Sequence, residues 1–213
     1  MPSGPFARPF VYPIVDADAL RGRPVAAAVR ALAEGGAALV QVRAKTLPDG
    51  ALLGFAREAL AAARAAGLRL IVNDRADVAR IAGADGVHVG QEDLPPAACR
   101  TVLGAGALVG LSTHDLAQVS AAVREPIDYL AVGPVFPTRT KASPDPVVGL
   151  DLVRRARDLW SGPLVAIGGI TAANAAEVVR AGADGVAVIS ALLDADDLRD
   201  AVRRLQGALG GRA

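Results

Sequence analysis

Short apolar runs alternate with alanine-rich segments of helical periodicity along almost the whole chain. The apolar runs are rich in Val, Ile and Leu, which is typical of strands buried on both faces; they cover 10–15, 38–43, 70–73, 86–89, 108–112, 129–132, 164–167 and 185–189. Segments with helical spacing lie between them, at 24–34, 52–66, 115–124, 150–160, 172–180 and 197–209. Eight strands in strict alternation with helices predict parallel pairing, and therefore an α/β fold of the TIM-barrel type, (β/α)8, with short loops.

Length and composition agree with such a barrel. A chain of 213 residues is near the lower limit for this fold, so we expect a single domain over 1–213, with 1–8 as a flexible N-terminal tail. Hydrophobic residues make up 52% of the chain but aromatic residues only 3%, which predicts a core of Ala, Val, Leu and Ile.

Charge and hydropathy exclude several classes of partner. The formal net charge is +1 and the charges are interspersed, so no basic stripe for nucleic acid is expected. No run reaches the roughly 18 apolar residues needed to cross a bilayer, and no signal peptide is visible, which favours a cytoplasmic protein without membrane association. The single cysteine, Cys99, excludes a disulfide within the chain and is expected to be a buried small hydrophobe.

A short motif repeats at the ends of helices. The sequence Ala-Gly-Ala-Asp-Gly-Val occurs at 82–87 and again at 181–186, with a looser copy at 34–39. Its glycines suit the left-handed conformation of a helix C-cap. Asp85 and Asp184 therefore fall at the amino ends of their strands, where we expect them to stabilise turns rather than to take part in chemistry.

Polar clusters follow the carboxyl ends of the predicted strands, and in a parallel barrel these ends share the rim that carries active sites. Gln41, Arg43 and Lys45 alternate along the end of the second strand, so at least the first two point to the same side. Together they can hold phosphoryl oxygens through charge-assisted hydrogen bonds. The alternative is that they are ordinary surface charges.

Asp74 and Asp93 follow the third and fourth strands, which are neighbours in a barrel. Two carboxylates suit Mg²⁺, which is often held by one or two carboxylates together with substrate phosphates. The alternative makes Asp74 a helix N-cap and Asp93 a loop cap.

Ser112 closes the fifth strand without the elbow motif of a serine hydrolase, so donation of a hydrogen bond to a leaving phosphate is its simplest role. His114 lies close by and is expected to be a supporting residue or a helix start rather than a base. His88, inside its strand, is expected to be a packed, hydrogen-bonded core histidine.

A second anion site is predicted after the seventh and eighth strands. Gly168 and Gly169 on one side, and Ile189 and Ser190 on the other, are each expected to open a helix whose backbone N–H groups bind a monophosphate. Two anion sites on one rim imply two phosphorylated substrates.

The segment 134–148 is the longest without clear periodicity, and it contains Thr138, Thr140 and Lys141. A loop of this length in so short a chain favours a lid over the rim; the alternative is a plain solvated connection.

These motifs, taken in order, resemble the thiamine phosphate synthase (thiamine-phosphate pyrophosphorylase) family over nearly the whole chain. Two positions depart from the family pattern: Val15 stands where Thr or Ser is common, and Val42 stands where Leu is usual. Neither position is expected to touch substrate. The matching motifs are YPIVD at 12–16, QVRAK at 41–45, NDRAD at 73–77, GADGVHVGQED at 83–93, GLSTH at 110–114, GPVFPTRTK at 133–141 and AIGGI at 166–170.

The resemblance implies a transferase of thiamine biosynthesis. It would join 4-amino-2-methyl-5-hydroxymethylpyrimidine diphosphate to 4-methyl-5-(2-phosphoethyl)thiazole, release pyrophosphate and form thiamine phosphate, by a dissociative, Mg²⁺-assisted substitution. The residues it assigns are Asp74 and Asp93 for Mg²⁺; Gln41, Arg43, Lys45, Asn73, Ser112 and Lys141 for the pyrimidine diphosphate, with Ser112 and Lys141 catalytic; and Thr138, Thr140, Gly168, Ile189 and Ser190 for the thiazole phosphate. The oligomeric state is left open, with a homodimer as one option.

Three other functions compete with this interpretation. A thiazole tautomerase would share the fold, but it resembles a synthase that has lost diphosphate binding and carries a histidine where this chain has Pro134. A sugar-phosphate isomerase or epimerase would share the Gly168–Gly169 site and leave the cationic cluster at 41–45 unexplained. A regulatory, metabolite-binding barrel is not excluded by fold alone, although such a protein need not keep Asp74 and Asp93.

Overall fold

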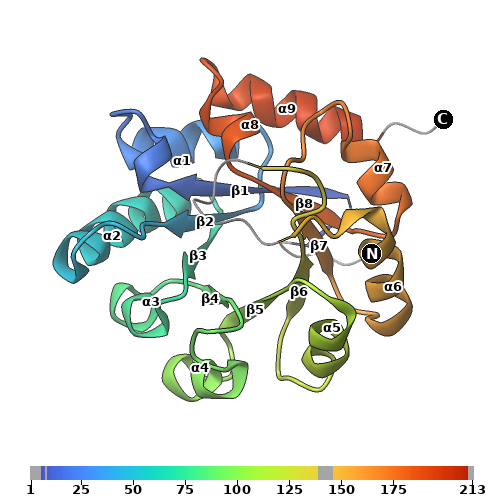
Figure 1. The fold of residues 1–213 in the computed structure, drawn as a ribbon. Helices are drawn as coiled ribbons and strands as arrows, with labels where there is room; N and C mark the ends of the chain where they lie inside the picture. The colour runs from blue at the N-terminus through green and yellow to red at the C-terminus, as the bar shows by residue number, and fades with distance from the viewer. Residues whose placement is uncertain (1–5, 8, 139–145, 211–213) are drawn as a thin grey trace.

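A computed structural model describes the protein over residues 6, 7, 9–138 and 146–210. All eight strands are parallel and close into a barrel in sequence order, with β8 beside β1 (Figure 1). The predicted fold is confirmed, and every predicted strand boundary lies within one residue of the observed one. The strands are β1 (Phe10–Asp16), β2 (Leu39–Arg43), β3 (Arg69–Asn73), β4 (Gly86–Val89), β5 (Leu108–Thr113), β6 (Tyr129–Val132), β7 (Leu164–Ile167) and β8 (Gly185–Val188).

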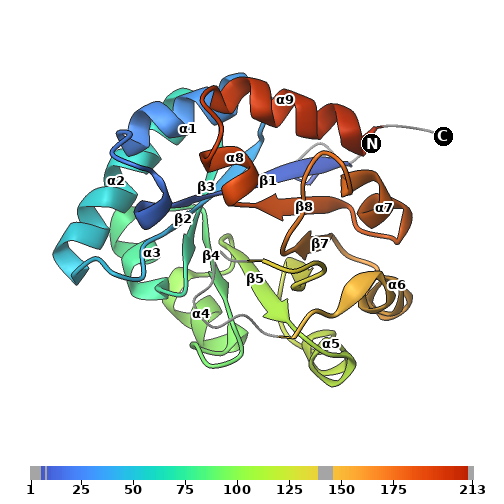
Figure 2. The ribbon, with the colours of Figure 1, turned by 45° about the horizontal axis from the view of Figure 1, so that its top comes forward.

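The helices surround the strands as an outer ring (Figures 1 and 2). None of them, within the described part of the chain, is long and apolar enough to span a membrane. They are α1 (Val25–Glu34), α2 (Asp49–Ala65), α3 (Ala76–Ala82), α4 (Pro96–Leu103), α5 (Leu116–Ala122), α6 (Gly149–Leu159), α7 (Ala175–Arg180), α8 (Ser190–Leu193) and α9 (Leu198–Leu209), with a short 3-10 helix η1 (Ala17–Ala19) after β1.

Two helices begin three residues away from the predicted start, whereas the other four predicted starts lie within one residue of the observed ones. Helix α2 begins earlier, at Asp49, because Pro48 supplies a φ suited to helix entry and Asp49 favours the first turn. Helix α7 begins later, at Ala175, because a turn precedes it: the Asn174 side chain accepts the N–H of Thr171 (2.8 Å) and donates to the carbonyl of Gly169 (3.0 Å). The expectation that the Gly168–Gly169 pair opens a helix directly is therefore wrong.

The core has two parts of different composition. Between the strands and the helices it is aliphatic, as predicted, and the thiol of Cys99 is buried there. Inside the barrel, however, both tyrosines of the chain pack with Phe10. The ring of Phe6 lies against Phe10 and Tyr129, with centroid distances of 5.6 and 5.3 Å. Four of the seven aromatic residues of the chain thus belong to the barrel interior, and Phe55, Phe136 and Trp160 pack against the outer part of the core.

Three aspartates hold the amino-terminal end of the barrel, each directly before an even-numbered strand. Each carboxylate accepts the backbone N–H of a residue at the start of the preceding odd-numbered strand, and each also pairs with an arginine. The bonds join Asp85 to Leu70 (2.8 Å), Asp128 to Val109 (2.7 Å) and Asp184 to Leu164 (2.9 Å), and the arginines are Arg69, Arg100 and Arg157 respectively. The predicted turn-stabilising role of Asp85 and Asp184 is confirmed.

At β1 the backbone N–H near the start of the strand is bonded by a side chain from the other end of the chain, Gln206. The Gln206 side chain of α9 accepts the N–H of Val11 (3.2 Å) and donates to the carbonyl of Pro9 (2.8 Å). The looser copy of the motif at 34–39 has Ala37 where the other two copies have aspartate. A glutamine from the last helix thus satisfies the backbone group that an aspartate satisfies elsewhere.

We expect Asp184→Ala to lower the free energy of unfolding by about 3 kcal/mol, because the change removes the buried carboxylate that pairs with the partly buried Arg157 guanidinium and accepts the N–H of Leu164. The matched control is Asp200→Ala, which breaks an exposed pair with Arg204 and should cost less than about 1 kcal/mol. Urea unfolding of the two variants measures both, and equal losses would contradict the role of Asp184.

Candidate active site

The carboxyl end of β2 carries three of the predicted site residues, which the structure places in different surroundings. Gln41 points into the barrel, is 2% exposed and donates from Nε2 to the Tyr12 hydroxyl (3.1 Å). Arg43 pairs with the buried carboxylate of Asp16, its neighbour on β1. Lys45 lies beyond the strand and pairs with Asp74.

Asp16 is a site residue that the analysis of the sequence did not single out. It is 3% exposed, and its other oxygen accepts the N–H of Asp18 (3.0 Å). A buried carboxylate on the β1 side holds the Arg43 guanidinium in one orientation at the rim. An aspartate at the end of an otherwise apolar first strand was the signal that could have identified it.

Asp74 and Asp93 lie in contact at the ends of β3 and β4. Burial raises the pKa of the Asp74 carboxyl above its usual value, the Lys45 ammonium opposes the rise, and Asp93 adds to it. Among the described residues no third acidic, histidine or cysteine side chain completes a larger cluster. Two adjacent carboxylates at an open rim fit Mg²⁺, whose remaining positions are commonly taken by water and phosphate.

The alternative roles considered for these aspartates were a helix N-cap for Asp74 and a loop cap for Asp93, and the structure shows only the second. Asp74 does not cap α3, whose N-cap is Arg75 and has no side-chain cap bond. It has a φ of 60°, in the left-handed region, a sparsely populated conformation of the kind that clusters at functional sites. Asp93 does cap its loop, since its Oδ2 accepts the N–H of Gly90 (2.7 Å). That bond fixes the carboxylate and leaves its second oxygen uncommitted to the cap.

Ser112 and His88 form a pair below the rim. The Ser112 Oγ lies 2.8 Å from His88 Nε2, and His88 Nδ1 lies 3.0 Å from the Tyr129 hydroxyl. Burial lowers the pKa of His88 to about 4, with a smaller opposing effect of Asp93, so the ring is neutral at neutral pH. His88 is thus buried and hydrogen-bonded, as predicted.

His114 lies at the start of α5, as predicted. Its backbone N–H donates to the Gln118 side chain (2.7 Å) and its Nδ1 lies 2.7 Å from the carbonyl oxygen of Gly133. The helix itself is capped by Asp115, which accepts the N–H of Gln118 (2.8 Å). These bonds engage His114 in local structure.

Gly168 and Gly169 follow β7 with φ values of 98° and 64°, which favour glycine. The chain after β6 lies directly against them: Phe136 donates its N–H to the carbonyl of Gly168 (3.0 Å), and a Cβ at position 168 would lie 2.5 Å from the Cα of Pro134. Ser190 begins α8, a short helix, directly after Ile189. The predicted helix start at Ile189 and Ser190 is confirmed.

The segment predicted to be a lid is described only at its two ends. Thr138 lies within the described residues, whereas Arg139, Thr140 and Lys141 lie outside them. The ends are joined, since Val148 donates its N–H to the carbonyl of Pro134 (2.9 Å). Asn73, the last predicted contact, ends β3 next to Asp74.

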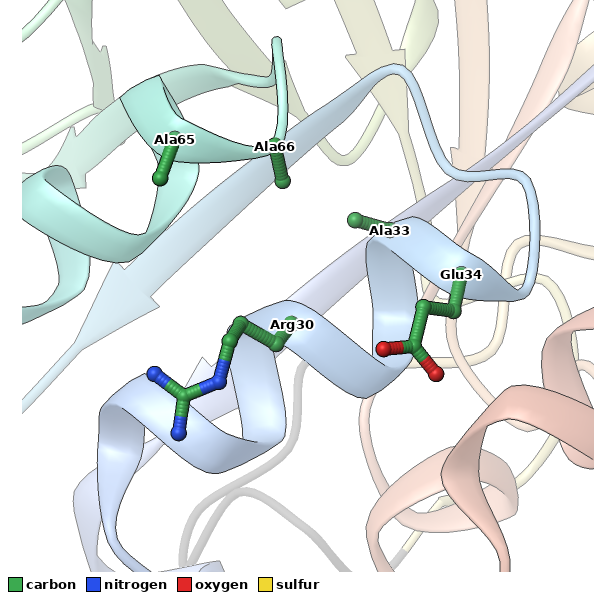
Figure 3. A pocket seen from close by; sticks show the side chains of 5 residues that line it. All are labelled: Arg30, Ala33, Glu34, Ala65 and Ala66. Carbon is green, nitrogen blue, oxygen red and sulfur yellow. The ribbon is translucent and has the colours of Figure 1, made fainter.

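A shallow pocket lies away from the rim, at the carboxyl ends of α1 and α2 (Figure 3). Two charged side chains, Arg30 and Glu34, line it together with Ala33, Ala65 and Ala66. In a parallel barrel the helix carboxyl ends adjoin the strand amino ends, so this pocket is on the face opposite to the site described above.

The chain is a closed parallel (β/α)8 barrel whose carboxyl-end rim, the place of active sites in enzymes of this fold, carries cations, paired carboxylates and a glycine turn. The family model for thiamine monophosphate synthase matches residues 11–192, and the chain belongs to this family. It is accordingly a transferase of thiamine biosynthesis.

Individual relatives agree with this assignment. The chain is 48% identical to a thiamine-phosphate synthase of Chloroflexus aurantiacus over 196 residues, covering 92% of this chain and 90% of that one. It is 49% identical to a thiamine-phosphate synthase of Koribacter versatilis, covering 87% and 89%. The solved structure of a thiamine phosphate pyrophosphorylase from Pyrococcus furiosus is similar with a TM-score of 0.84 at 33% identity, covering 95% of this chain and 96% of that one.

Proposed function

We propose that this protein forms thiamine phosphate from 4-amino-2-methyl-5-hydroxymethylpyrimidine diphosphate and 4-methyl-5-(2-phosphoethyl)thiazole, with release of pyrophosphate. The observation that carries the proposal is the division of the rim. Cations and paired carboxylates follow β2, β3 and β4, whereas a glycine turn and the start of α8 follow β7 and β8, across the barrel mouth. One sector suits a metal-bound diphosphate and the other a monophosphate.

On the diphosphate side, Arg43 and Lys45 are the cationic donors. Asp16 and Asp74 hold these two side chains in place before substrate binds, which reduces the entropy lost on binding. Asp74 and Asp93 would hold Mg²⁺, which supplies Lewis-acid stabilisation of charge on a departing pyrophosphate when it is bound. Gln41, Asn73, Ser112 and Lys141 complete the set that we propose for this substrate.

On the monophosphate side, Gly168 and Ser190 offer backbone N–H groups to the thiazole phosphate, with Ile189 beside them. Thr138 and Thr140 supply hydroxyl groups from the segment after β6. The close approach of Phe136 to the glycine turn fixes the turn before substrate arrives.

The chemistry we propose is dissociative: the carbon–oxygen bond to the diphosphate breaks first, and the thiazole nitrogen then attacks the pyrimidinylmethyl cation. The groups that accelerate such a step stabilise negative charge on the leaving pyrophosphate. We assign this role to Ser112 and Lys141 and the remaining positioning to the rim. His88 is backed by the Tyr129 hydroxyl rather than by a carboxylate, so the Ser112–His88 pair lacks the third member of a hydrolase triad.

We further propose that residues 1–213 form one domain and that the enzyme works in the cytoplasm, as a monomer or a homodimer, on small-molecule substrates without nucleic acid or a membrane as partner. The scattered charges support the absence of a nucleic-acid partner. Sedimentation of the purified protein decides between monomer and dimer.

The direct test is to mix the purified protein with both substrates and Mg²⁺ and to follow thiamine phosphate as fluorescent thiochrome, with EDTA as a control. We expect product that depends on Mg²⁺. Binding of both substrates without product would favour a regulatory protein. A failure to bind the diphosphate would mean that the cationic sector has been misinterpreted.

Ser112→Ala is expected to lower kcat by about 10²-fold, as for loss of one donor to a charge that develops in the transition state, with little change in KM. The matched control is Ser120→Ala, whose hydroxyl donates to the Leu116 carbonyl on the exposed face of α5. Equal rates in the Ser112 variant and the unmodified enzyme would remove Ser112 from the mechanism.

A further inference from the structure

Four hydrogen bonds form an unbroken line through the barrel interior and end at Ser112. Gln41 Nε2 lies 3.1 Å from the Tyr12 hydroxyl, which lies 2.9 Å from the Tyr129 hydroxyl. Tyr129 reaches His88 Nδ1 at 3.0 Å, and His88 Nε2 reaches Ser112 Oγ at 2.8 Å. The five side chains come from β2, β1, β6, β4 and β5, so the line crosses the barrel.

The chemistry of the groups gives this line a direction. The Gln41 amide nitrogen can only donate, so the Tyr12 oxygen accepts and its single proton goes to Tyr129. Tyr129 in turn has one proton, and it goes to Nδ1 of His88. A neutral imidazole that accepts at Nδ1 carries its proton on Nε2, which therefore donates to Ser112 Oγ.

The two tyrosines of this line are buried, and a glycine beside them leaves the space that their side chains occupy. Tyr12 and Tyr129 are at most 1% exposed, and burial raises the pKa of both phenols far above the usual value, so they stay protonated. Gly110 of β5 lies beside them: a Cβ there would be 2.1 Å from Cζ of Tyr129 and 2.5 Å from His88 Nδ1. The absence of a side chain at 110 is what lets the Tyr129–His88 bond form.

We propose that His88 and Tyr129 are positioning residues that make Ser112 an obligatory hydrogen-bond donor toward substrate. One of the two lone pairs of Ser112 Oγ accepts the Nε2 proton of His88, so Ser112 cannot donate to His88 and its own proton is directed to an oxygen at the rim. This inference rests on the proposed role of Ser112 in the transfer and adds the reason why it acts as a donor.

The same direction of the hydrogen bonds prevents Ser112 from acting as the nucleophile of a hydrolase. A serine becomes a nucleophile when an adjacent histidine accepts its proton. Here Nε2 of His88 already carries a proton, so it cannot serve as that base. The Ser112–His88 pair therefore has the spacing of a nucleophilic dyad and the opposite polarity.

The position of the proton on His88 tests the inference without turnover. Long-range ¹H–¹⁵N correlation spectra separate protonated from unprotonated ring nitrogens, and the chain has only two histidines, so the variant His114→Gln assigns the signals. We expect the Nε2–H tautomer for His88 in the unmodified protein. The Nδ1–H tautomer would mean that Ser112 donates to His88, and it would overturn the inference.

Two matched variants extend the test to catalysis. Tyr129→Phe removes the proton given to Nδ1, so we expect mixed tautomer signals and a kcat about tenfold lower, equivalent to one hydrogen bond. Tyr12→Phe removes the proton that Tyr129 accepts, so the Tyr129 hydroxyl can then either donate to Nδ1 of His88 or accept from it, and we expect partly mixed tautomer signals with a smaller loss of kcat than in Tyr129→Phe. An unchanged kcat in Tyr129→Phe would overturn the inference.

Replacement of His88 itself separates positioning from packing. His88→Gln can still donate from its amide nitrogen toward Ser112 and should retain more activity than His88→Leu, which cannot. If the two variants lose activity equally, the role of His88 is only structural. A protein that shows the Nε2–H tautomer and makes no thiamine phosphate would refute the proposed function and still establish the direction of the hydrogen bonds from Tyr129 through His88 to Ser112. The tautomer of His88 in the unmodified protein shows the direction of these hydrogen bonds even if a variant fails to fold.

Discussion

Asp93→Asn should lower Mg²⁺-dependent turnover by about a thousandfold, because it removes one of the two carboxylates proposed to hold the ion that balances the charge of the leaving pyrophosphate. The substitution isolates the charge. An asparagine oxygen can still accept the N–H of Gly90, so the loop cap that Asp93 provides is kept. It also relieves Asp74 of a like charge, so the expected loss does not come from added repulsion.

The measurement is kcat over a series of MgCl₂ concentrations, together with calorimetric binding of Mn²⁺ in the presence of the diphosphate. Asp77→Asn is the matched control, since Asp77 is an exposed carboxylate of α3 that pairs with Arg75. We expect that control to keep its rate and its magnesium dependence. A variant at position 93 with an unchanged magnesium curve would place the metal elsewhere.

Gly168→Ala should damage both stability and binding of the thiazole phosphate. The residue has a φ of 98°, and an added Cβ would lie 2.5 Å from the Cα and Cβ of Pro134. Strain in the backbone and overpacking together should lower the free energy of unfolding by about 3 kcal/mol. Displacement of the turn should raise KM for the thiazole phosphate about tenfold or more, since we propose that backbone N–H groups of this turn bind the phosphate.

Gly54→Ala is the control for this change. Gly54 lies inside α2 with open space around it, so an alanine there should raise the free energy of unfolding by roughly 0.5–1 kcal/mol and leave both KM values unchanged. Urea unfolding and the thiochrome assay read both variants. A Gly168 variant that is as stable and as active as the Gly54 variant would show that the turn tolerates a side chain and does not bind the phosphate.

The strands could be predicted because a parallel barrel imposes a simple pattern on each of them. Because each strand is buried on both faces, its sequence is a continuous apolar run. The polar residue that ends the run marks the rim. Helix starts were harder. The turn before α7 depends on side-chain bonds of Asn174 to Thr171 and Gly169, which compete with a helix over the same residues and leave no trace in its periodicity.

The sequence indicated which residues lie at the rim, but only some of the contacts among the site residues. Neighbouring strands place Asp74 beside Asp93, and this could be inferred from strand order alone. The line from Gln41 to Ser112 could not, because Tyr12 and Tyr129 meet across the interior from β1 and β6, which are not neighbours. Such a contact follows from barrel diameter and side-chain length rather than from any local pattern.

The alternation of aspartate bonds at the bottom of the barrel divides it into four two-strand units. Three are closed from within, by Asp85, Asp128 and Asp184, whereas the unit of β1 and β2 needs Gln206 from α9. During synthesis on the ribosome the first unit to emerge is therefore the last to be completed. The nascent chain exposes an unsatisfied edge at β1 until α9 has been made, and a chaperone that shields this edge would protect the barrel when it is most open to aggregation.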